Sequence, residues 1–285
     1  MAKLAENSYG KSRVRLVKVL RPAFGLHQVK DWTINILLEG DYEACFTAGD
    51  NSKILPTDTM KNTVYSLARD SSASCIEEFA TELVNHFLRS AAAASSVTVE
   101  VSEKKWEHVL VNGEPHPSTF HQRDLDQQTA VVMRAREGEF KVVSGLKGLV
   151  ALKTANSGFE GFIKDRLTTL LESADRLFGT EVTANWTYGS ESVGSKFDFD
   201  QIRGLIVRTL LSTFAEHVSL SVQHTLFAMG EAVLRAASSV QEISLTMPNR
   251  HCLLVNLEPF GQDNPNEIFV PTDEPHGTIE ARIIR

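Results

Sequence analysis

Apolar and polar residues follow two different periods along the chain, and each period predicts a different element. Between residues 31 and 46, Trp32, Ile34 and Ile36 alternate with the residues between them, which is typical of a half-buried strand. Between residues 76 and 88, the apolar positions recur every three or four residues and form one stripe along a helix. The stripe contains Ile76, Phe79, Ala80, Leu83, Val84, Phe87 and Leu88. The chain is therefore expected to mix strands with helices.

The first half of the chain is predicted to consist of strands that frame two helices. Thr57 or Asp58 is expected to cap the first helix, and Ser74 with Glu77 forms a capping box in front of the second. The helices are expected at residues 59–69 and 76–88. The strands are expected at residues 13–18 and 31–46, around 97–101 and around 129–133.

The second half repeats this order. Its helices are expected over residues 202–214 and about 225–237, where apolar residues again recur at helical spacing. An extra helical segment is predicted at 159–172. The strands are expected at residues 140–152, 181–188, 243–247 and 251–257.

The two halves are therefore two copies of strand, strand, helix, helix, strand, strand, in pattern more than in residue identity. Runs of strands that frame runs of helices indicate an α+β fold with antiparallel sheets and helices on one face. We place the first repeat at residues 1–137 and the second, with a C-terminal tail, at residues 138–285. Such sheets leave edges to protect, and closing the sheets of several subunits into an oligomeric barrel would protect them.

Charge and composition restrict the classes of partner. The 285 residues include 36 acidic and 29 basic ones, so the formal net charge is -7. This balance argues against broad binding of nucleic acid or of anionic membranes, both of which require a basic face. A small anionic ligand stays compatible with it, since a few local cations can govern one pocket.

Several features indicate a cytoplasmic protein. The three cysteines, Cys45, Cys75 and Cys252, are too few and too far apart in sequence for a disulfide framework. Residues 1–10 lack the apolar core of a secretory signal, and no apolar run approaches the roughly 20 residues that span a bilayer. The final Ile-Ile-Arg is not a peroxisomal signal of the Ser-Lys-Leu type.

Common catalytic motifs are missing. The sequence has no glycine-rich dinucleotide fingerprint, no P-loop and no Gly-x-Ser-x-Gly elbow. His116 and His121 lie five residues apart, a spacing that does not pair them as metal ligands, and we expect no metal site. The patterns alone indicate only an oligomeric α+β protein.

Five short blocks, in order between residue 9 and about residue 260, resemble the urate oxidase family. Each block is weak alone, but all five occur in register along nearly the whole chain. The blocks are Tyr9-Gly10-Lys11 before the basic strand 13–18; Thr57-Asp58 with Lys61-Asn62-Thr63 and Tyr65; residues 152–159 followed by Phe162, Leu170 and Arg176; Ser221-Val222-Gln223; and Pro248-Asn249-Arg250-His251.

The resemblance implies a tandem T-fold, also called the tunnelling fold, in a homotetramer whose active sites lie at subunit interfaces. It also implies a bacterial type of urate oxidase, since the peroxisomal tail is absent. Two positions depart from the family pattern: Ala155 stands where a hydroxyl residue is usual, and Leu167 where an aromatic is usual. Neither position contacts the ligand in the family.

The resemblance also implies a substrate site. Arg176 would donate two parallel hydrogen bonds to one edge of urate, and Gln223 would bind the opposite edge as both donor and acceptor. Phe159 would stack on the ring face, and the Val222 amide would add a donor. Asp58 would cap its helix, contact the substrate, or do both. Without the resemblance, a surface arginine, a solvent-facing glutamine and a core phenylalanine would be the simpler interpretations.

By the same resemblance, Lys11, Thr57 and His251 form a proton relay. Thr57 would take a proton from urate while Lys11 takes one from Thr57, which requires surroundings that favour a neutral lysine. His251 would exchange protons with Lys11. Asn249 would donate to dioxygen and then to the attacking water.

The implied reaction converts urate, O2 and water to 5-hydroxyisourate and H2O2 without a metal or an organic cofactor, because dianionic urate is itself strongly reducing. Two alternatives stay open. One is a non-catalytic purine-binding T-fold scaffold. The other is a pteridine or purine enzyme of the same fold, which would use a zinc site or a glutamate anchor.

Overall fold

The computed structural model describes residues 2–122, 126–189 and 197–285. The chain divides into two compact units, Met1–Leu146 and Lys147–Arg285. The division falls inside strand β7 (Lys141–Lys153), and Gly138, at which the sequence repeat was divided, lies in the turn before this strand. The units are described one at a time.

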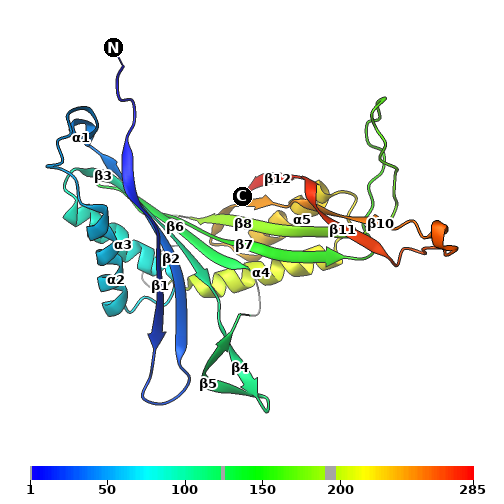
Figure 1. The fold of residues 1–285 in the computed structure, drawn as a ribbon, viewed down its shortest axis with the longest axis horizontal. Coiled ribbons are helices and arrows are strands. Elements are labelled where there is room, and N and C mark those ends of the chain that lie inside the picture. The colour runs from blue at the N-terminus through cyan, green and yellow to red at the C-terminus, as the bar shows by residue number, and fades with distance from the viewer. Residues whose placement is uncertain (1, 123–125, 190–196) are drawn as a thin grey trace. The chain divides into compact units, whose positions relative to one another are not determined.

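Unit 1 contains an antiparallel sheet in the order β1-β2-β3-β6 (Figure 1). Inward-facing residues are paired across it: Ile36 lies opposite Val99, and Val99 lies opposite Val132. The four strands are β1 (Ser8–Leu20), β2 (Gln28–Gly40), β3 (Ala94–Lys104) and β6 (Gln127–Ala135).

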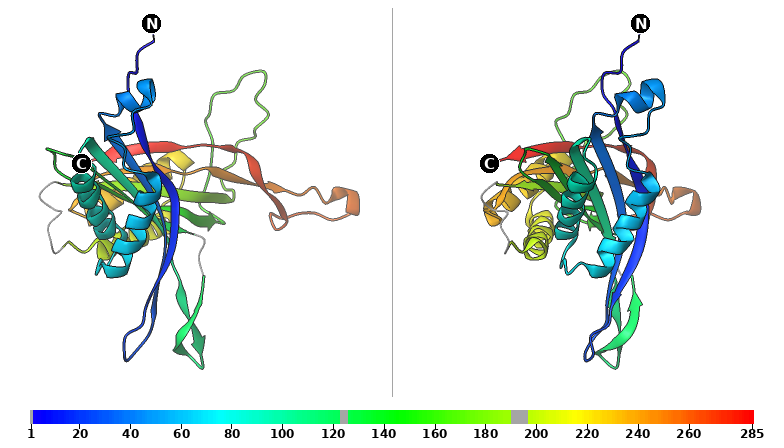
Figure 2. Two further views of the ribbon diagram at one scale, coloured as in Figure 1. Left: turned by 60° about the vertical axis from the view of Figure 1, so that its left-hand side comes forward. Right: turned by 90° about the vertical axis from the view of Figure 1, so that its left-hand side faces the viewer.

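Helices α2 (Thr57–Asp70) and α3 (Ile76–Ser90) pack on one face of this sheet, as Figures 1 and 2 show. The predicted apolar stripe of α3 is confirmed, since all seven of its members are buried. Trp32 of β2 stacks on Phe79 of α3 with ring centroids 4.8 Å apart. Burying side chains of this size is worth about 1.5–3 kcal/mol each, so the stripe holds the helix on the sheet.

Both predicted helix caps of unit 1 are wrong. Helix α2 has Pro56 as its N-cap and no side-chain cap, so Thr57 is the first helical residue. At α3, Ser74 bonds the carboxylate of Glu78, with its backbone N–H 2.6 Å from Oε2. Glu77 lies on the buried face instead and accepts a hydrogen bond from Ser144. Glu77 and Glu78 are adjacent in the sequence. Because the Glu77 side chain is buried, Glu78 is the carboxylate that bonds Ser74.

Two elements of unit 1 were not predicted. The strand predicted at residues 31–46 ends at Gly40, and helix α1 (Glu43–Ala48) replaces its last part. A hairpin of β4 (Glu107–Val111) and β5 (Glu114–His121) lies between β3 and β6 in the chain. The hairpin turns at Asn112 and Gly113, which both have positive φ, the geometry that an Asn-Gly turn provides.

Unit 2 repeats the order of elements. Helices α4 (Phe199–Glu216) and α5 (Val222–Ala236) follow β8 (Phe178–Tyr188). Strand β9 (Val240–Thr246) then pairs with β8, and β12 (Glu280–Ile284) pairs with β9. The core between helices and strands contains Trp186, Ile206, Leu210, Leu226, Val233 and Ile243.

The closing strands of unit 2 differ from the prediction. The segment predicted at 251–257 is β10 (Asn249–Leu254), which pairs with the start of β8 and with β11 (Phe269–Gly277) and not with β9. Strands β10 and β11 form a long arm that ends in a short 3-10 helix, Glu258–Phe260 (Figure 1). Strand β9 pairs instead with β12, near the C-terminus. Strand β12 has only five residues, too few to give a clear alternation of apolar and polar positions in the sequence.

The helix predicted at residues 159–172 is also wrong. Figure 1 shows an extended loop, closed at its base by a bridge between Phe159 and Ser173. Gly161 has φ +70, which interrupts a right-handed helix. Ile163 is 95% exposed and Leu171 is 83% exposed, so the apolar residues of this segment form no buried stripe of the kind that holds a helix on a sheet.

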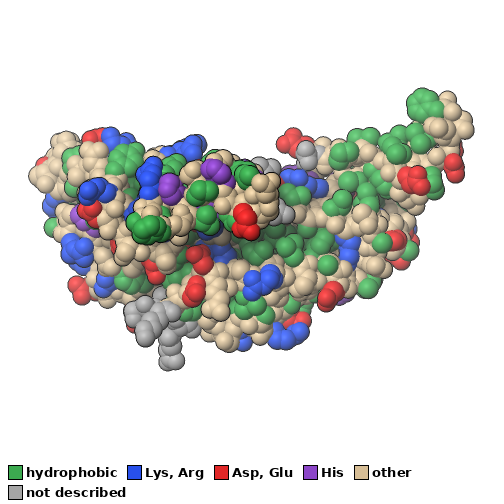
Figure 3. All heavy atoms as spheres, turned by 90° about the horizontal axis from the view of Figure 1, so that it is seen from below, with side chains coloured by type: hydrophobic (Ala, Val, Ile, Leu, Met, Phe, Trp, Pro, Cys, Tyr) green, Lys and Arg blue, Asp and Glu red, His purple; other side chains and the backbone are tan. Residues whose placement is uncertain are grey.

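Acidic and basic side chains are interspersed over the face drawn in Figure 3, with no large patch of one sign. In the described part of the chain, no helix has the length and apolarity to cross a membrane. The same residues contain no cluster of three or more metal-ligating side chains.

Candidate active site

The predicted substrate residues of unit 2 lie on three segments that backbone hydrogen bonds hold together. The N–H of Arg176 donates to Ser157 O at 2.6 Å, which ties Arg176 to the segment before Phe159. The N–H of Gly158 donates to Ser219 O at 2.8 Å, which ties that segment to the residues before α5. Sequence positions far apart thus meet around the start of one helix.

Arg176 carries the clearest unsatisfied donor of this site. Its guanidinium lies over the Phe159 ring, 5.2 Å from the centroid. Its Nε is buried and has no acceptor among the described residues. Burial lowers the pKa of Arg176, but a guanidinium stays charged at neutral pH. A buried donor without a partner costs stability, which indicates that a ligand supplies the acceptor.

The first turn of α5 adds further donors. The hydroxyl of Ser221, the N-cap, accepts from the N–H of His224 at 3.1 Å. The N–H groups of Val222 and Gln223 precede the first intrahelical bond and lack intrahelical partners. Val222 is buried, whereas the Gln223 side chain is exposed. The helix start therefore presents backbone and side-chain donors next to a cation and an aromatic ring.

Asn249 and His251 lie on β10 of the same unit. Asn249 is paired with Thr180 of β8, the strand that follows Arg176 in the chain. His251 is paired with Thr272 of β11, whose hydroxyl donates to His251 O at 3.2 Å. Both residues are half-buried. The pairing of Asn249 joins β10 to the strand that follows Arg176 in the chain, and His251 lies two residues further along β10.

Lys11 lies on β1 in unit 1, where the backbone is unusually close to its neighbour. A Cβ on Gly10 would come within 1.8 Å of Ile36 O, so only glycine fits before Lys11. Directly after Lys11 the register shifts at a bulge, and Arg13 has φ 58 with its N–H donating to Asn35 Oδ1 at 2.8 Å. Bulges of this kind redirect neighbouring side chains.

Thr57 and Asp58 form the start of α2. Thr57 is half-buried, and its hydroxyl has no hydrogen-bond partner among the described residues. Asp58 accepts hydrogen bonds from Lys61 and, at 3.0 Å, from Asn62. The hydrogen bond from Lys61 lowers the pKa of Asp58 most, and the charge of Lys11 lowers it further. Lys11 and the start of α2 therefore lie within electrostatic range of each other.

Two supporting residues were missed from the sequence. Tyr9 Oη accepts from the N–H of Leu55 at 2.8 Å, which links β1 to the segment before Thr57. Asp175 Oδ1 accepts from the N–H of Ser157 at 3.1 Å, which braces the arginine segment. Tyr9 stood in the quoted Tyr-Gly-Lys block, but nothing in the sequence names its partner.

The predicted site residues thus fall into two sets. The set in unit 1 contains Lys11, Thr57 and Asp58. The set in unit 2 contains Phe159, Arg176, Val222, Gln223, Asn249 and His251.

Comparison with known proteins gives a consistent result. The Uricase family model matches residues 7–133 and 142–280. The chain is 40% identical over 282 residues to uricase of Arthrobacter globiformis, covering 99% of this chain and 90% of the relative. It is 37% identical over 287 residues to uricase of Dictyostelium discoideum, covering 100% and 98%.

Solved structures agree with this result. The crystal structure of uricase from Arthrobacter globiformis superposes with a TM-score of 0.92 at 40% identity, covering 100% of this chain and 96% of that one. Urate oxidase from Bacillus sp. TB-90 superposes with a TM-score of 0.84 at 23% identity, covering 98% and 100%. The second comparison supports the fold alone.

Proposed function

The chain belongs to the uricase family and oxidises urate with molecular oxygen, and from that premise we propose which of its residues bind urate and which move protons. The resemblance found in the sequence and the predicted α+β T-fold class are confirmed. Nothing in the comparisons favours a non-catalytic scaffold or a pteridine enzyme. The roles of individual residues, the oligomeric state and the cytoplasmic location stay predictions.

Urate binding is assigned to the set in unit 2. The observation that carries this proposal is the buried, unpartnered Nε of Arg176 beside the Phe159 ring. A guanidinium fork matches the carbonyl and ring nitrogen along one edge of urate, and the ring of Phe159 offers a stacking surface. Gln223 and the Val222 amide, at the start of α5, supply donors for the opposite edge.

Proton transfer is assigned to Thr57 and Lys11, with His251 as exchange partner. A hydroxyl without another hydrogen bond is free to take a proton from a urate N–H, provided that Lys11 accepts the hydroxyl proton. Asp58 is held by Lys61 and Asn62, which fits a positioning or substrate-contacting role.

The reaction then balances without any further reactant. The urate dianion gives two electrons to O2, which collects two protons and becomes H2O2. Water adds to the oxidised ring, so that its hydroxyl completes 5-hydroxyisourate and its proton returns to the relay. Asn249 would hold O2, and afterwards the water, above the ring. The protein contributes orientation and charge stabilisation, and we propose that no cofactor takes part.

The two sets belong to different units, and we propose that each active site combines them from two subunits. A two-fold axis would bring unit 1 of one subunit against unit 2 of its neighbour, which yields two identical sites per dimer and, with two such dimers, a homotetramer. Urate and O2 are the substrates that this shared site would take.

A direct assay tests the function. The protein is incubated with urate in air, and the ultraviolet band of urate and the peroxide formed are followed with and without a chelator. We expect the band to bleach and peroxide to form equally in both samples. Binding without bleaching would contradict the catalytic assignment, and loss of activity with chelator would contradict the proposed absence of a metal.

A further inference from the structure

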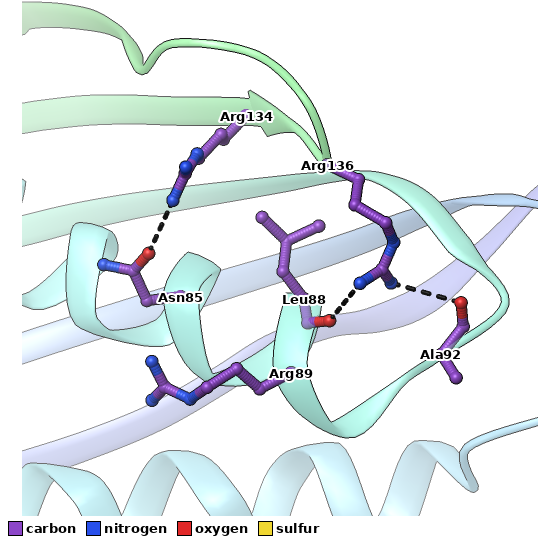
Figure 4. Close-up of a pocket in the computed structure, with 6 residues that line it drawn as sticks. All are labelled: Asn85, Leu88, Arg89, Ala92, Arg134 and Arg136. Carbon is purple, nitrogen blue, oxygen red and sulfur yellow. Dashed lines mark hydrogen bonds between the residues drawn. The ribbon is translucent and has the colours of Figure 1, made fainter.

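A basic pocket lies in unit 1, between the end of α3 and strand β6, and none of the residues assigned to urate lines it (Figure 4). Its volume is about 460 Å³. The residues that line it are Asn85, Leu88, Arg89, Ala92, Arg134 and Arg136.

The charge of this pocket is uncompensated. Within the described residues, none of its three arginines has a carboxylate oxygen within 4.0 Å of a guanidinium nitrogen. Glu137 and Glu139 flank Gly138 in the adjoining turn, but neither forms an ion pair with them. In a chain with a formal net charge of -7, three arginines in one pocket without an acidic partner form an unusual local excess of positive charge.

One of the three arginines is fully engaged by the fold. Arg136 donates to Leu88 O at 2.9 Å, to Ala91 O at 2.9 Å and to Ala94 O at 2.7 Å, so it caps the C-terminal end of α3. It contributes positive charge to the pocket while its hydrogen bonds serve the helix end.

The other two arginines retain free donors. Arg134 is fixed by bonds from Nε to Gly138 O at 2.9 Å and from one terminal nitrogen to Asn85 Oδ1 at 3.1 Å, and by its position over the Phe140 ring. Its second terminal nitrogen has no acceptor among the described residues. Arg89 is exposed and forms no ion pair there. Figure 4 shows Arg89 and Arg134 on the same side of the pocket as Asn85.

We propose that this pocket binds a tetrahedral oxyanion of the phosphate class, either free phosphate or the phosphoryl group of a small phosphate ester. Arg134 supplies a preorganised donor, Arg89 closes on the anion from the helix, and the Asn85 amide nitrogen is available as a neutral donor. The pocket is larger than one phosphate, and Leu88 offers an apolar wall to the body of an ester.

His86 gives a spectroscopic readout of this site. Burial lowers the pKa of the His86 imidazole, and the positive charge of Arg89 lowers it further. An anion bound at Arg89 would offset that charge, so the pKa of His86 would rise when phosphate binds.

The test uses the full-length protein and inorganic phosphate, titrated at constant ionic strength against chloride. Binding is followed by calorimetry and by the NMR signal of the His86 ring. The variant Arg89→Gln removes one cation from an exposed position without touching the core. The control is Arg235→Gln, because Arg235 is likewise an exposed arginine in the last turn of a helix, α5.

We expect saturable phosphate binding, a raised pKa of His86 in the complex, and a loss of affinity of about tenfold or more in Arg89→Gln but not in Arg235→Gln. Titrations with ribose 5-phosphate and with ribose distinguish a phosphate ester from free phosphate as the ligand. If ribose 5-phosphate binds more tightly than inorganic phosphate, the ligand is a phosphate ester. If the two bind equally, the ligand is the free anion. Absence of saturable phosphate binding, or equal binding by parent and Arg89→Gln, would overturn the proposal. Unchanged urate oxidation in Arg89→Gln is expected, since Arg89 is not among the residues proposed for the active site.

Discussion

Replacing Tyr9 by phenylalanine tests whether the two catalytic segments of unit 1 are held together by one hydrogen bond. The Tyr9 hydroxyl accepts from the Leu55 N–H at 2.8 Å in partly buried surroundings. Its ring contacts Tyr42 edge-on with centroids 4.7 Å apart, a contact that phenylalanine keeps. The substitution therefore removes the acceptor and leaves the packing in place.

The magnitude follows from the donor that is left behind. An N–H deprived of its partner in a buried place costs about 1–3 kcal/mol, and partial burial favours the lower end, about 1 kcal/mol. In a domain of this size that corresponds to a fall in Tm of roughly 2–4 °C. Lys11 lies two residues after Tyr9 on β1, and Thr57 lies two residues after Leu55. Loss of the bond between Tyr9 and Leu55 would therefore also loosen the alignment of the Thr57 hydroxyl with the Lys11 amine. We expect kcat to fall severalfold while KM stays nearly unchanged, since the proposed urate contacts lie mainly in unit 2.

The assay measures kcat and KM for urate together with Tm for Tyr9→Phe. Tyr65→Phe is the control, because Tyr65 is an exposed tyrosine on α2 outside both segments. A lower Tm with an unchanged kcat would refute the positioning role and leave Tyr9 a structural residue. A raised KM with an unchanged kcat would refute the assignment of urate binding to the residues of unit 2 and of proton transfer to Lys11 and Thr57 of unit 1.

Three further predictions concern single side chains. Arg176→Lys keeps the charge but loses the planar fork, so the affinity for a urate analogue, measured by calorimetry, should fall roughly 10- to 150-fold; an unchanged affinity would exclude Arg176 as the clamp. Lys11→Met should lower kcat about 100-fold or more while analogue binding is retained, and proportional losses of both would contradict the relay. Burial lowers the pKa of His217, and His224 and Lys153 lower it further. The unfolded chain therefore binds that proton more readily, and the free energy of unfolding should fall as the pH drops below about 6.5. Denaturant titrations across this range should show a weaker pH dependence in His217→Gln, and an equal dependence would disprove the role of His217.

Much of the fold could be predicted because the apolar residues that recur with a helical or strand period are the residues that the fold buries. The stripe on α3 has every member buried, and the alternating residues of β2 and β3 face each other across the sheet. The prediction failed where apolar residues lie in solvent: Ile163 and Leu171 mimic a helix stripe, but no part of the unit covers them. A periodic pattern shows that a face is apolar, and it leaves open whether that face finds a partner within the chain.

The candidate site was less accessible to sequence reasoning. Arg176 and Phe159 are an ordinary arginine and phenylalanine until the fold places the guanidinium over the ring. The hydrogen bond between Tyr9 and Leu55 joins residues far apart in the chain, so no local signal indicates it. Only the resemblance to the family singled out the individual residues, because their chemistry depends on long-range contacts.

The most direct test of the shared active site combines two inactive variants, Thr57→Ala and Arg176→Ala, in mixed oligomers obtained by co-expression. In a mixed dimer, one site would receive both lesions and the other neither. With random and equal mixing, about a quarter of all sites would then be intact. We predict that urate oxidation rises well above that of either variant alone. A mixture no more active than its parents, with mixed oligomers shown to be present, would contradict the assembly of each site from two subunits.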